Sequence, residues 1–138
     1  MKYISCKRSA YGGISVRNEG VNSTNNAYFF IEGYARRADP YDPELRAELT
    51  VSFFNFNPNE NNQPVAPNYF VVATDYDNYA VVYNNINPEF ELLWILTREP
   101  FPDSNLIENV KAEIEALNID ISSLIEQDHS TCSSLPPL

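Results

Sequence analysis

Histidine and cysteine, which are common in catalytic and metal sites, are few and scattered in this sequence. His129 is the only histidine, and it stands between Asp128 and Ser130 near the C-terminus. A single histidine without a partnering nucleophile is usually a solvated side chain, so we predict no catalytic role for it. Asp75 and Asp77 suit a tight turn better than a metal site. With no Gly-rich phosphate loop either, the sequence predicts neither an enzyme, nor a metal site, nor a cofactor.

Two further features carry possible covalent chemistry. Cys6 and Cys132 lie near opposite ends of the chain. A disulfide between them would close a very long loop, with an entropic gain of about 4–5 kcal/mol, but two unrelated buried thiols fit the count equally well. Asn22-Ser23-Thr24 is an N-glycosylation sequon in an Asn-rich turn. We predict Asn22 as a glycosylation site, which would place the protein outside the cell.

Charge and hydropathy exclude several classes of partner. The formal net charge is −10 and the pI about 4.4, so the field of the protein repels nucleic acid and anionic membrane surfaces. The simplest use of this charge is solubility. The longest apolar run, Leu92 to Leu96, is far below the roughly 18 residues of a membrane span. The N-terminal residues contain no apolar segment typical of a signal peptide.

The elements that would position any site are short strands followed by one helix. At 138 residues we expect a single domain over 1–138. Alternating or apolar runs bounded by Gly, Pro, Asn and Asp predict seven strands, at 3–11, 14–17, 27–35, 48–54, 69–74, 79–84 and 91–98. After Pro100 and Pro102, Asp103 or Ser104 can cap a helix whose apolar residues recur on one face. The tail 119–127 fits a short strand or a helical turn. The sequence therefore predicts a meandering antiparallel sheet, with one helix covering part of its outer face.

Three stretches resemble the lipocalin family, and most closely the apolipoprotein D-like group and its arthropod relatives. They are the turn Thr74-Asp75-Tyr76-Asp77-Asn78-Tyr79-Ala80, the strand Leu93-Trp94-Ile95-Leu96-Thr97-Arg98, and the segment Cys6-Lys7-Arg8-Ser9-Ala10-Tyr11. The resemblance covers nearly the whole chain; it is specific over 69–98 and weak over 12–67. It implies a mainly β fold, an antiparallel up-and-down barrel whose C-terminal α-helix packs outside. It also implies that Cys6 and Cys132 form a disulfide and that the protein is secreted.

The sequence departs from the family pattern in two places. The Gly-x-Trp of the family's first strand is absent, because the chain begins where the second strand should begin. A second family disulfide would use a cysteine near Asn84 or Asn85. We therefore expect a barrel that lacks its first strand. In the family an arginine at the position of Arg98 lies across the first-strand tryptophan, so Arg98 is expected to lose its stacking partner.

The resemblance implies that the barrel holds a small hydrophobic ligand, such as a fatty acid, steroid, retinoid, carotenoid or bilin. The predicted contacts are Trp94 and Tyr11 from the family, and by alternation along the strands Leu92, Leu96, Phe53 (with Val51 and Leu49), Phe29 or Phe30, and Tyr83. Each of these side chains could instead serve only core packing. The alternative function is an interaction protein that dimerises or binds a partner through exposed strand edges. An incomplete product without a stable fold is a third possibility.

Overall fold

The computed structural model describes residues 3–8, 13–22, 24–25, 27–53, 63–87 and 90–129, with backbone alone for 3–8, 85–87 and 90. These residues contain seven strands and one helix. They form two compact units, divided between Tyr69 and Phe70, and each unit is considered by itself. No helix in the described ranges is long and apolar enough to cross a lipid bilayer.

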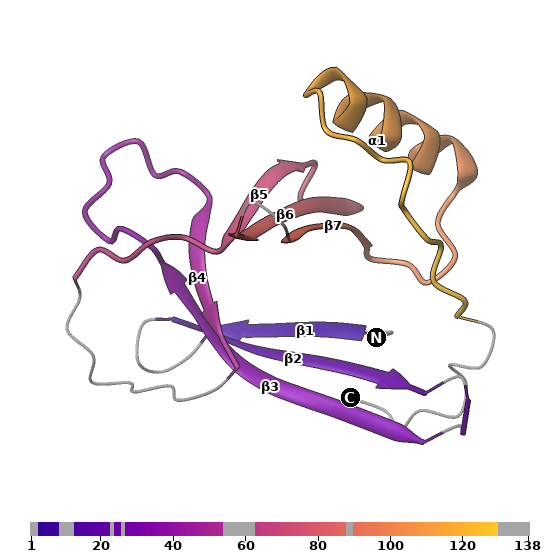
Figure 1. The fold of residues 1–138 in the computed structure, drawn as a ribbon, viewed down its shortest axis with the longest axis horizontal. Coiled ribbons are helices and arrows are strands. Elements are labelled where there is room, and N and C mark those ends of the chain that lie inside the picture. The colour runs from indigo at the N-terminus through magenta and orange to yellow at the C-terminus, as the bar shows by residue number, and fades with distance from the viewer. Residues whose placement is uncertain are drawn as a thin grey trace. The chain divides into compact units, whose positions relative to one another are not determined.

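The first unit is an antiparallel sheet of four strands in chain order (Figure 1). The strands are β1 (Tyr3–Arg8), β2 (Ile14–Val21), β3 (Tyr28–Arg37) and β4 (Glu48–Ser52). All four coincide with predicted strands, although β2 continues to Val21 where a loop was expected after Arg17. Asn18 and Gly20 have low strand propensity, but their pairing with Ile31 and Phe29 of β3 overrides that preference.

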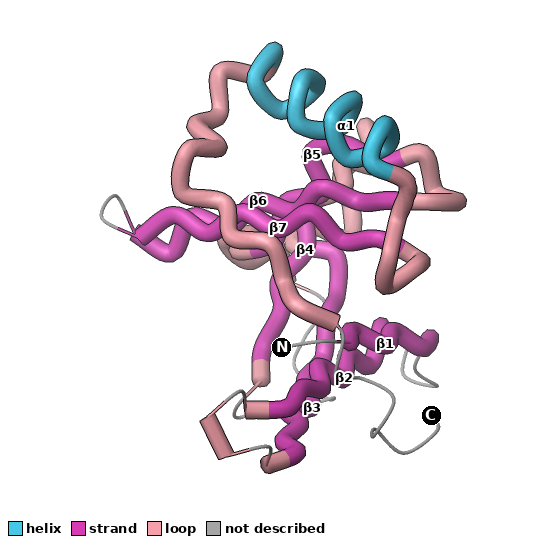
Figure 2. The backbone as a smooth tube through the Cα atoms, turned by 90° about the vertical axis from the view of Figure 1, so that its right-hand side faces the viewer, coloured by secondary structure: helices cyan, strands magenta, loops and turns pink. Residues whose placement is uncertain are grey.

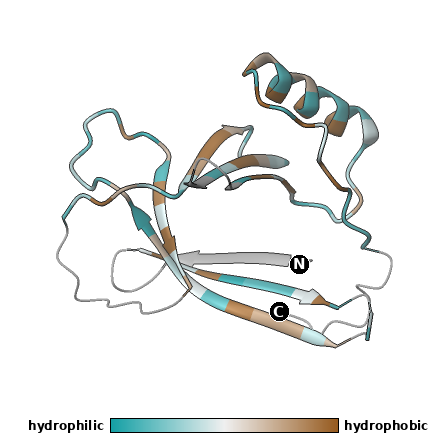
Figure 3. Ribbon diagram, viewed as in Figure 1, coloured by the Kyte–Doolittle hydropathy of each residue, from teal (hydrophilic) through white to brown (hydrophobic). Residues whose placement is uncertain are grey.

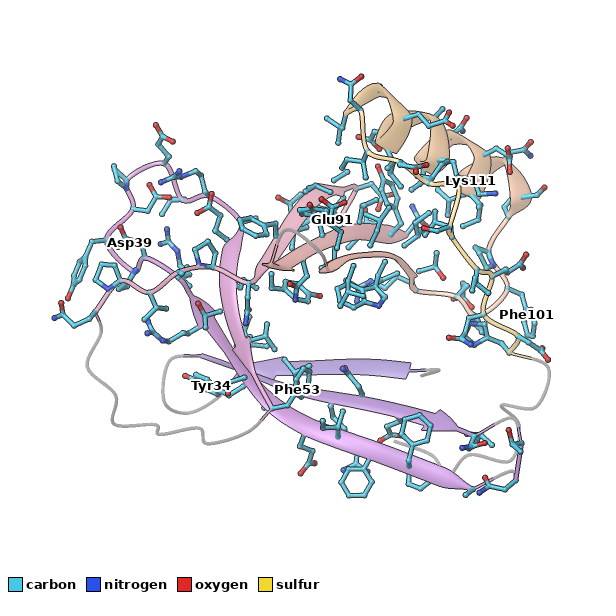
Figure 4. All side chains as sticks on the ribbon, viewed as in Figure 1. Tyr34, Asp39, Phe53, Glu91, Phe101 and Lys111 are labelled. Carbon is cyan, nitrogen blue, oxygen red and sulfur yellow. The ribbon has the colours of Figure 1, made fainter. Side chains whose placement is uncertain are left out.

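A close approach between β3 and β4 depends on a glycine. A Cβ atom at Gly33 would lie 2.6 Å from the Phe53 ring and 2.6 Å from the Ser52 carbonyl oxygen. Phe53, just beyond β4, therefore lies against the backbone of β3 (Figure 4). The Phe53 ring could turn away from a Cβ atom at this position, but the Ser52 carbonyl belongs to the backbone and could not. The position therefore requires glycine.

The second unit begins with three antiparallel strands and ends with the helix. The strands are β5 (Tyr69–Thr74), β6 (Tyr79–Asn87) and β7 (Phe90–Thr97), and the pairing of β6 with both neighbours contains an irregularity. The helix α1 (Ser104–Ala116) is capped by Asp103, whose side chain accepts a 2.8 Å hydrogen bond from the Asn105 backbone N–H. The predicted strands and the predicted helix are thus confirmed, with the expected cap.

Helix α1 lies over the sheet of β5, β6 and β7, as Figure 2 shows. Both hydrophobic and hydrophilic residues occur along it (Figure 3). The hydrophobic ones meet the sheet in a core of Val81, Val110 and Ile114, which are at most 2% exposed. The predicted use of the amphipathic stripe, which was to cover one face of the sheet, is therefore confirmed.

Of the two alternatives predicted for the chain after the helix, the structure has a turn and no strand. The Leu124 N–H donates to the Ile121 carbonyl over 3.0 Å, and the rest of 119–129 is irregular. Ile119 and Ile121 pack against the core under α1. The apolar spacing reflects this packing and not a regular element.

The β5–β6 turn is organised by one carboxylate. Asp75 Oδ1 accepts hydrogen bonds from the backbone N–H groups of Asp77, Asn78 and Tyr79 over 2.8–3.1 Å, and Asn78 Nδ2 donates to Oδ2 over 2.7 Å. These donors lower the pKa of Asp75 to about 2. The sequence prediction that Asp75 and Asp77 act as turn formers holds for Asp75, which makes all four of these contacts.

This turn predicts a specific acid sensitivity. Because the pKa of Asp75 is lower in the folded than in the unfolded protein, its stabilising effect is complete above about pH 4 and is lost as the pH falls toward 2. Urea unfolding across that range should show a decreasing free energy of unfolding. Asp75→Asn keeps one acceptor but removes the titration, so its pH dependence should be shallower, whereas Asp77→Asn should behave as wild type. Identical pH profiles for Asp75→Asn and wild type would contradict this role.

Candidate functional site

The two faces of the second unit's sheet differ in what covers them. Strand pairing places Val82 opposite Trp94 and Ala80 opposite Leu96. Directly opposed residues point to the same side of a sheet, and alternate residues along a strand share a face. We call the resulting set the Trp94 face: Val71, Thr74, Ala80, Val82, Asn84, Leu92, Trp94 and Leu96. The predicted sharing of one face by Leu92, Trp94 and Leu96 is confirmed.

The opposite face carries the helix. Leu93 and Ile95 lie there, packed against the core of Val81, Val110 and Ile114. Tyr83 is paired with Leu93, so it lies on this side and not with Trp94. Among the predicted contacts of this unit, Tyr83 is therefore the one that the structure does not bring together with the others.

The Trp94 face is apolar but not closed. Val82 is 1% exposed, Leu92 and Leu96 are half-buried, and Trp94 is 37% exposed. Tryptophan is the largest apolar side chain, and exposing it costs more than exposing any other residue of this face. A flat ligand laid against Trp94 would remove that surface from water.

A polar side chain, that of Asn84, interrupts this apolar face. Asn84, directly opposite Leu92, has its Oδ1 atom buried and without a hydrogen-bond partner. A buried amide oxygen in that state is unusual, because most buried polar atoms are paired. Residue-type reasoning missed Asn84 as a site residue. The signal was an amide in the alternating set Ala80, Val82, Asn84, where a strand core expects a hydrophobic residue.

The first unit has a comparable face, which we call the Phe53 face. Strand pairing places on it Ile14, Val16, Asn18, Gly20, Phe29, Ile31, Gly33, Ala35, Arg37, Leu49, Val51 and Phe53. The expectation from alternation left Phe29 and Phe30 open, and the pairing of Phe29 with Gly20 places Phe29 on this face. Phe29 is 40% exposed. Asn18, which is 7% exposed, repeats the feature seen at Asn84, with a buried and unpaired Oδ1.

The other face of the first unit is charged. The Arg17 guanidinium is bonded to Glu19, to Glu32 over 2.8 Å and to the Tyr28 hydroxyl over 3.0 Å, and it lies 4.0 Å from the centre of the Phe30 ring. The Glu19 carboxylate contributes most to raising the pKa of Arg17. Phe30 therefore belongs to a polar cluster and not to the Phe53 face.

Arg98 is not left without a partner. Its guanidinium donates to the Tyr76 carbonyl over 3.1 Å, and its backbone N–H donates to the Asn78 carbonyl over 2.9 Å. The prediction that Arg98 loses its stacking partner stays a prediction, but its guanidinium is not free. The β5–β6 turn holds it instead.

The remaining predicted residues divide by whether they can be described. Tyr11, Cys132 and the side chain of Cys6 lie outside the described residues. Asn22 is exposed, and its Oδ1 accepts a 2.8 Å hydrogen bond from the Thr24 backbone N–H, so the sequon forms a local Asx turn on the surface. Among the described residues no group of three or more His, Cys, Asp and Glu side chains is placed to hold a metal ion.

Comparison with known proteins agrees with this arrangement. Residues 5–129 match the family model described as a lipocalin-like domain. The chain is a lipocalin. The antiparallel strands and the helix α1 that follows them in the described residues fit that family.

The relatives of this lipocalin include apolipoprotein D from several mammals. The guinea pig protein (Cavia porcellus) is 35% identical over 74% of this chain and 51% of its own length, and the Bos taurus protein is 33% identical over 93% and 67%. The Lazarillo protein of Schistocerca americana is 30% identical over 85% of this chain and 53% of its own length. The chain spans about half the length of the first of these relatives. These matches concern the lipocalin-like domain that the chain shares with these proteins.

Proposed function

We propose that this lipocalin binds and carries a small hydrophobic molecule such as a fatty acid, steroid, retinoid, carotenoid or bilin. The observation that carries the proposal is the Trp94 face. It is apolar, its opposite side is already covered by α1, and its tryptophan is 37% exposed. The membership in the lipocalin family supports the same function.

The energetics set the expected affinity. Removing about 200 Å² of apolar ligand surface from water is worth at most about 5 kcal/mol. Placing a tryptophan against the ligand adds stacking and dispersion, and association then subtracts its entropic cost. Since 5 kcal/mol alone corresponds to a dissociation constant of about 0.2 mM, we expect binding in the high micromolar range.

The proposed contacts come from each unit separately. On the second unit they are Trp94, Leu92 and Leu96. On the first unit they are Phe53 and Phe29, together with Tyr11, which the family pattern nominates. Tyr83 is left out because it lies on the helix side of its sheet.

A compartment and two covalent features belong to the same proposal. We propose that the protein works outside the cell, with Cys6 and Cys132 joined as a disulfide and a glycan on Asn22. The exposure of Asn22 and its position in a surface turn support the glycan. Peptide mass mapping without reduction, before and after deglycosylation, tests both features.

Trp94 is the only tryptophan and so reports directly on binding. Titration of the protein with retinol should quench its fluorescence in a saturable way, with a half-point in the micromolar range. An unchanged signal with retinol, a fatty acid and a bilin would contradict the carrier function. If that protein also had the mass of a dimer in solution, the alternative of an interaction protein that pairs through strand edges would be favoured.

A further inference from the structure

We propose that Asn84 is the specificity-determining polar contact of the Trp94 face, and that the ligand is a neutral hydrophobic molecule bearing a hydroxyl or N–H donor, in preference to a carboxylic acid. The inference rests on the proposed ligand-binding function. It adds the chemistry of the ligand's polar end and the residue that recognises it.

The side-chain oxygen of Asn84 is an acceptor without a donor among the described residues. Asn84 Oδ1 is buried, and within the part of the chain that the structure describes neither a backbone nor a side-chain donor reaches it. Leaving such an acceptor unpaired lowers stability, because the oxygen has lost its hydrogen bonds to water and gained none in return. A leucine or valine at this position would match Val82 and Leu92 beside it and would carry no such cost. A donor from outside the protein offsets the cost, and a bound ligand against Trp94 can provide one.

Asn84 is a diagonal neighbour of Trp94 on the same face of the sheet. Val82 is paired with Trp94, and Asn84 follows two residues later on the same face, paired with Leu92. Diagonal neighbours on one face of an antiparallel pair are separated by roughly 7–8 Å. A ligand lying on the Trp94 ring would therefore reach Asn84 with one end. Its apolar body would contact the tryptophan, and its donor would meet the amide oxygen once the Asn84 side chain, whose oxygen is covered in this structure, turns toward the ligand.

A carboxylate is a poor polar end group for a ligand on this face. An ionised carboxylate has only acceptor atoms, so it cannot pair with Asn84 Oδ1. The Trp94 face contains no lysine or arginine to neutralise it. The guanidinium of Arg98 is bonded to Tyr76 at the opposite end of the strand pair. The net charge of −10 opposes an anionic ligand further.

The first unit repeats the feature on its own face. Asn18 follows Val16 by two residues, as Asn84 follows Val82, and its Oδ1 is also buried and unpaired. Asn18 is opposite Ile31, an apolar neighbour like Leu92. An amide acceptor set in a row of hydrophobic residues is therefore a repeated feature of this chain.

Retinol and retinoic acid form a matched pair of probes, because they share the same polyene and differ in the end group. At pH 7, where the acid is ionised, quenching of Trp94 should give a dissociation constant for retinol about tenfold lower than for retinoic acid, the effect of roughly one hydrogen bond. Asn84→Leu should bring the ratio of the two constants close to one. Tyr83→Phe is the control, since it removes a polar group from the next residue on the opposite face.

The outcomes separate the two proposals. If neither retinoid quenches the wild-type protein, the carrier function fails and this inference fails with it. If both bind but retinoic acid binds as tightly as retinol, or if Asn84→Leu leaves their ratio unchanged, this inference alone is overturned. Should Asn84→Leu fail to fold, as judged by circular dichroism, Asn84→Ala can be used for the same comparison of the two retinoids. It also removes the amide, and its side chain is smaller than that of leucine.

Discussion

Replacing Ile114 by alanine is expected to lower the free energy of unfolding by about 2–5 kcal/mol, the range for removing a large buried aliphatic side chain. Ile114 is fully buried on α1 and packs with Val81 and Val110. The substitution leaves a cavity between the helix and the sheet of β5–β7, whose few buried side chains cannot easily fill it. Urea unfolding followed by circular dichroism measures the change.

The adjacent residue provides a matched control. Glu115 is exposed on the same helix, so Glu115→Ala introduces the same alanine without a cavity. Its effect should stay within about 0.5 kcal/mol, as for most surface substitutions. Equal unfolding midpoints for the two variants would show that α1 does not hold the sheet through Ile114.

The helix α1 and the β5–β6 turn could be predicted from the sequence because each depends on residues that are close together in the chain. The period of apolar residues in α1 and its capping Asp103 are properties of neighbouring positions, as is the turn at Asp75. The end of β2 was harder to predict, because Asn18 and Gly20 become strand residues only through pairing with β3. The partner of Arg98 was also hidden, since a bond to the Tyr76 carbonyl depends on how the chain turns and not on residue type.

The candidate site was predictable in part for a related reason. Alternation correctly grouped Leu92, Trp94 and Leu96, because all three lie on one strand. Tyr83 belongs to a different strand, and its face depends on the β6–β7 register, which places it beside Leu93. Asn84 escaped notice because an amide in a strand is ordinary by composition. It becomes informative only when its oxygen is found buried and unpaired.

Replacing Trp94 by alanine should weaken retinol binding by roughly 30-fold while leaving the protein folded. Losing about 80 Å² of ligand contact corresponds to about 2 kcal/mol, which is roughly 30-fold in the dissociation constant. Trp94 is 37% exposed and lies on the face away from α1, so its side chain contributes less to stability than the buried core does. Because the variant has no tryptophan, the emission of retinol itself should be followed in both proteins.

Leu93→Ala makes this test specific to one face. Leu93 is adjacent to Trp94 in the chain but packs against the core under α1. It should lower the free energy of unfolding by about 1–3 kcal/mol and change the retinol dissociation constant by no more than about twofold. Trp94→Ala should show the reverse pattern, with a large loss of affinity and a small loss of stability. If both variants lost affinity in proportion to stability, binding would depend on the integrity of the whole unit, and the Trp94 face would not be the ligand surface.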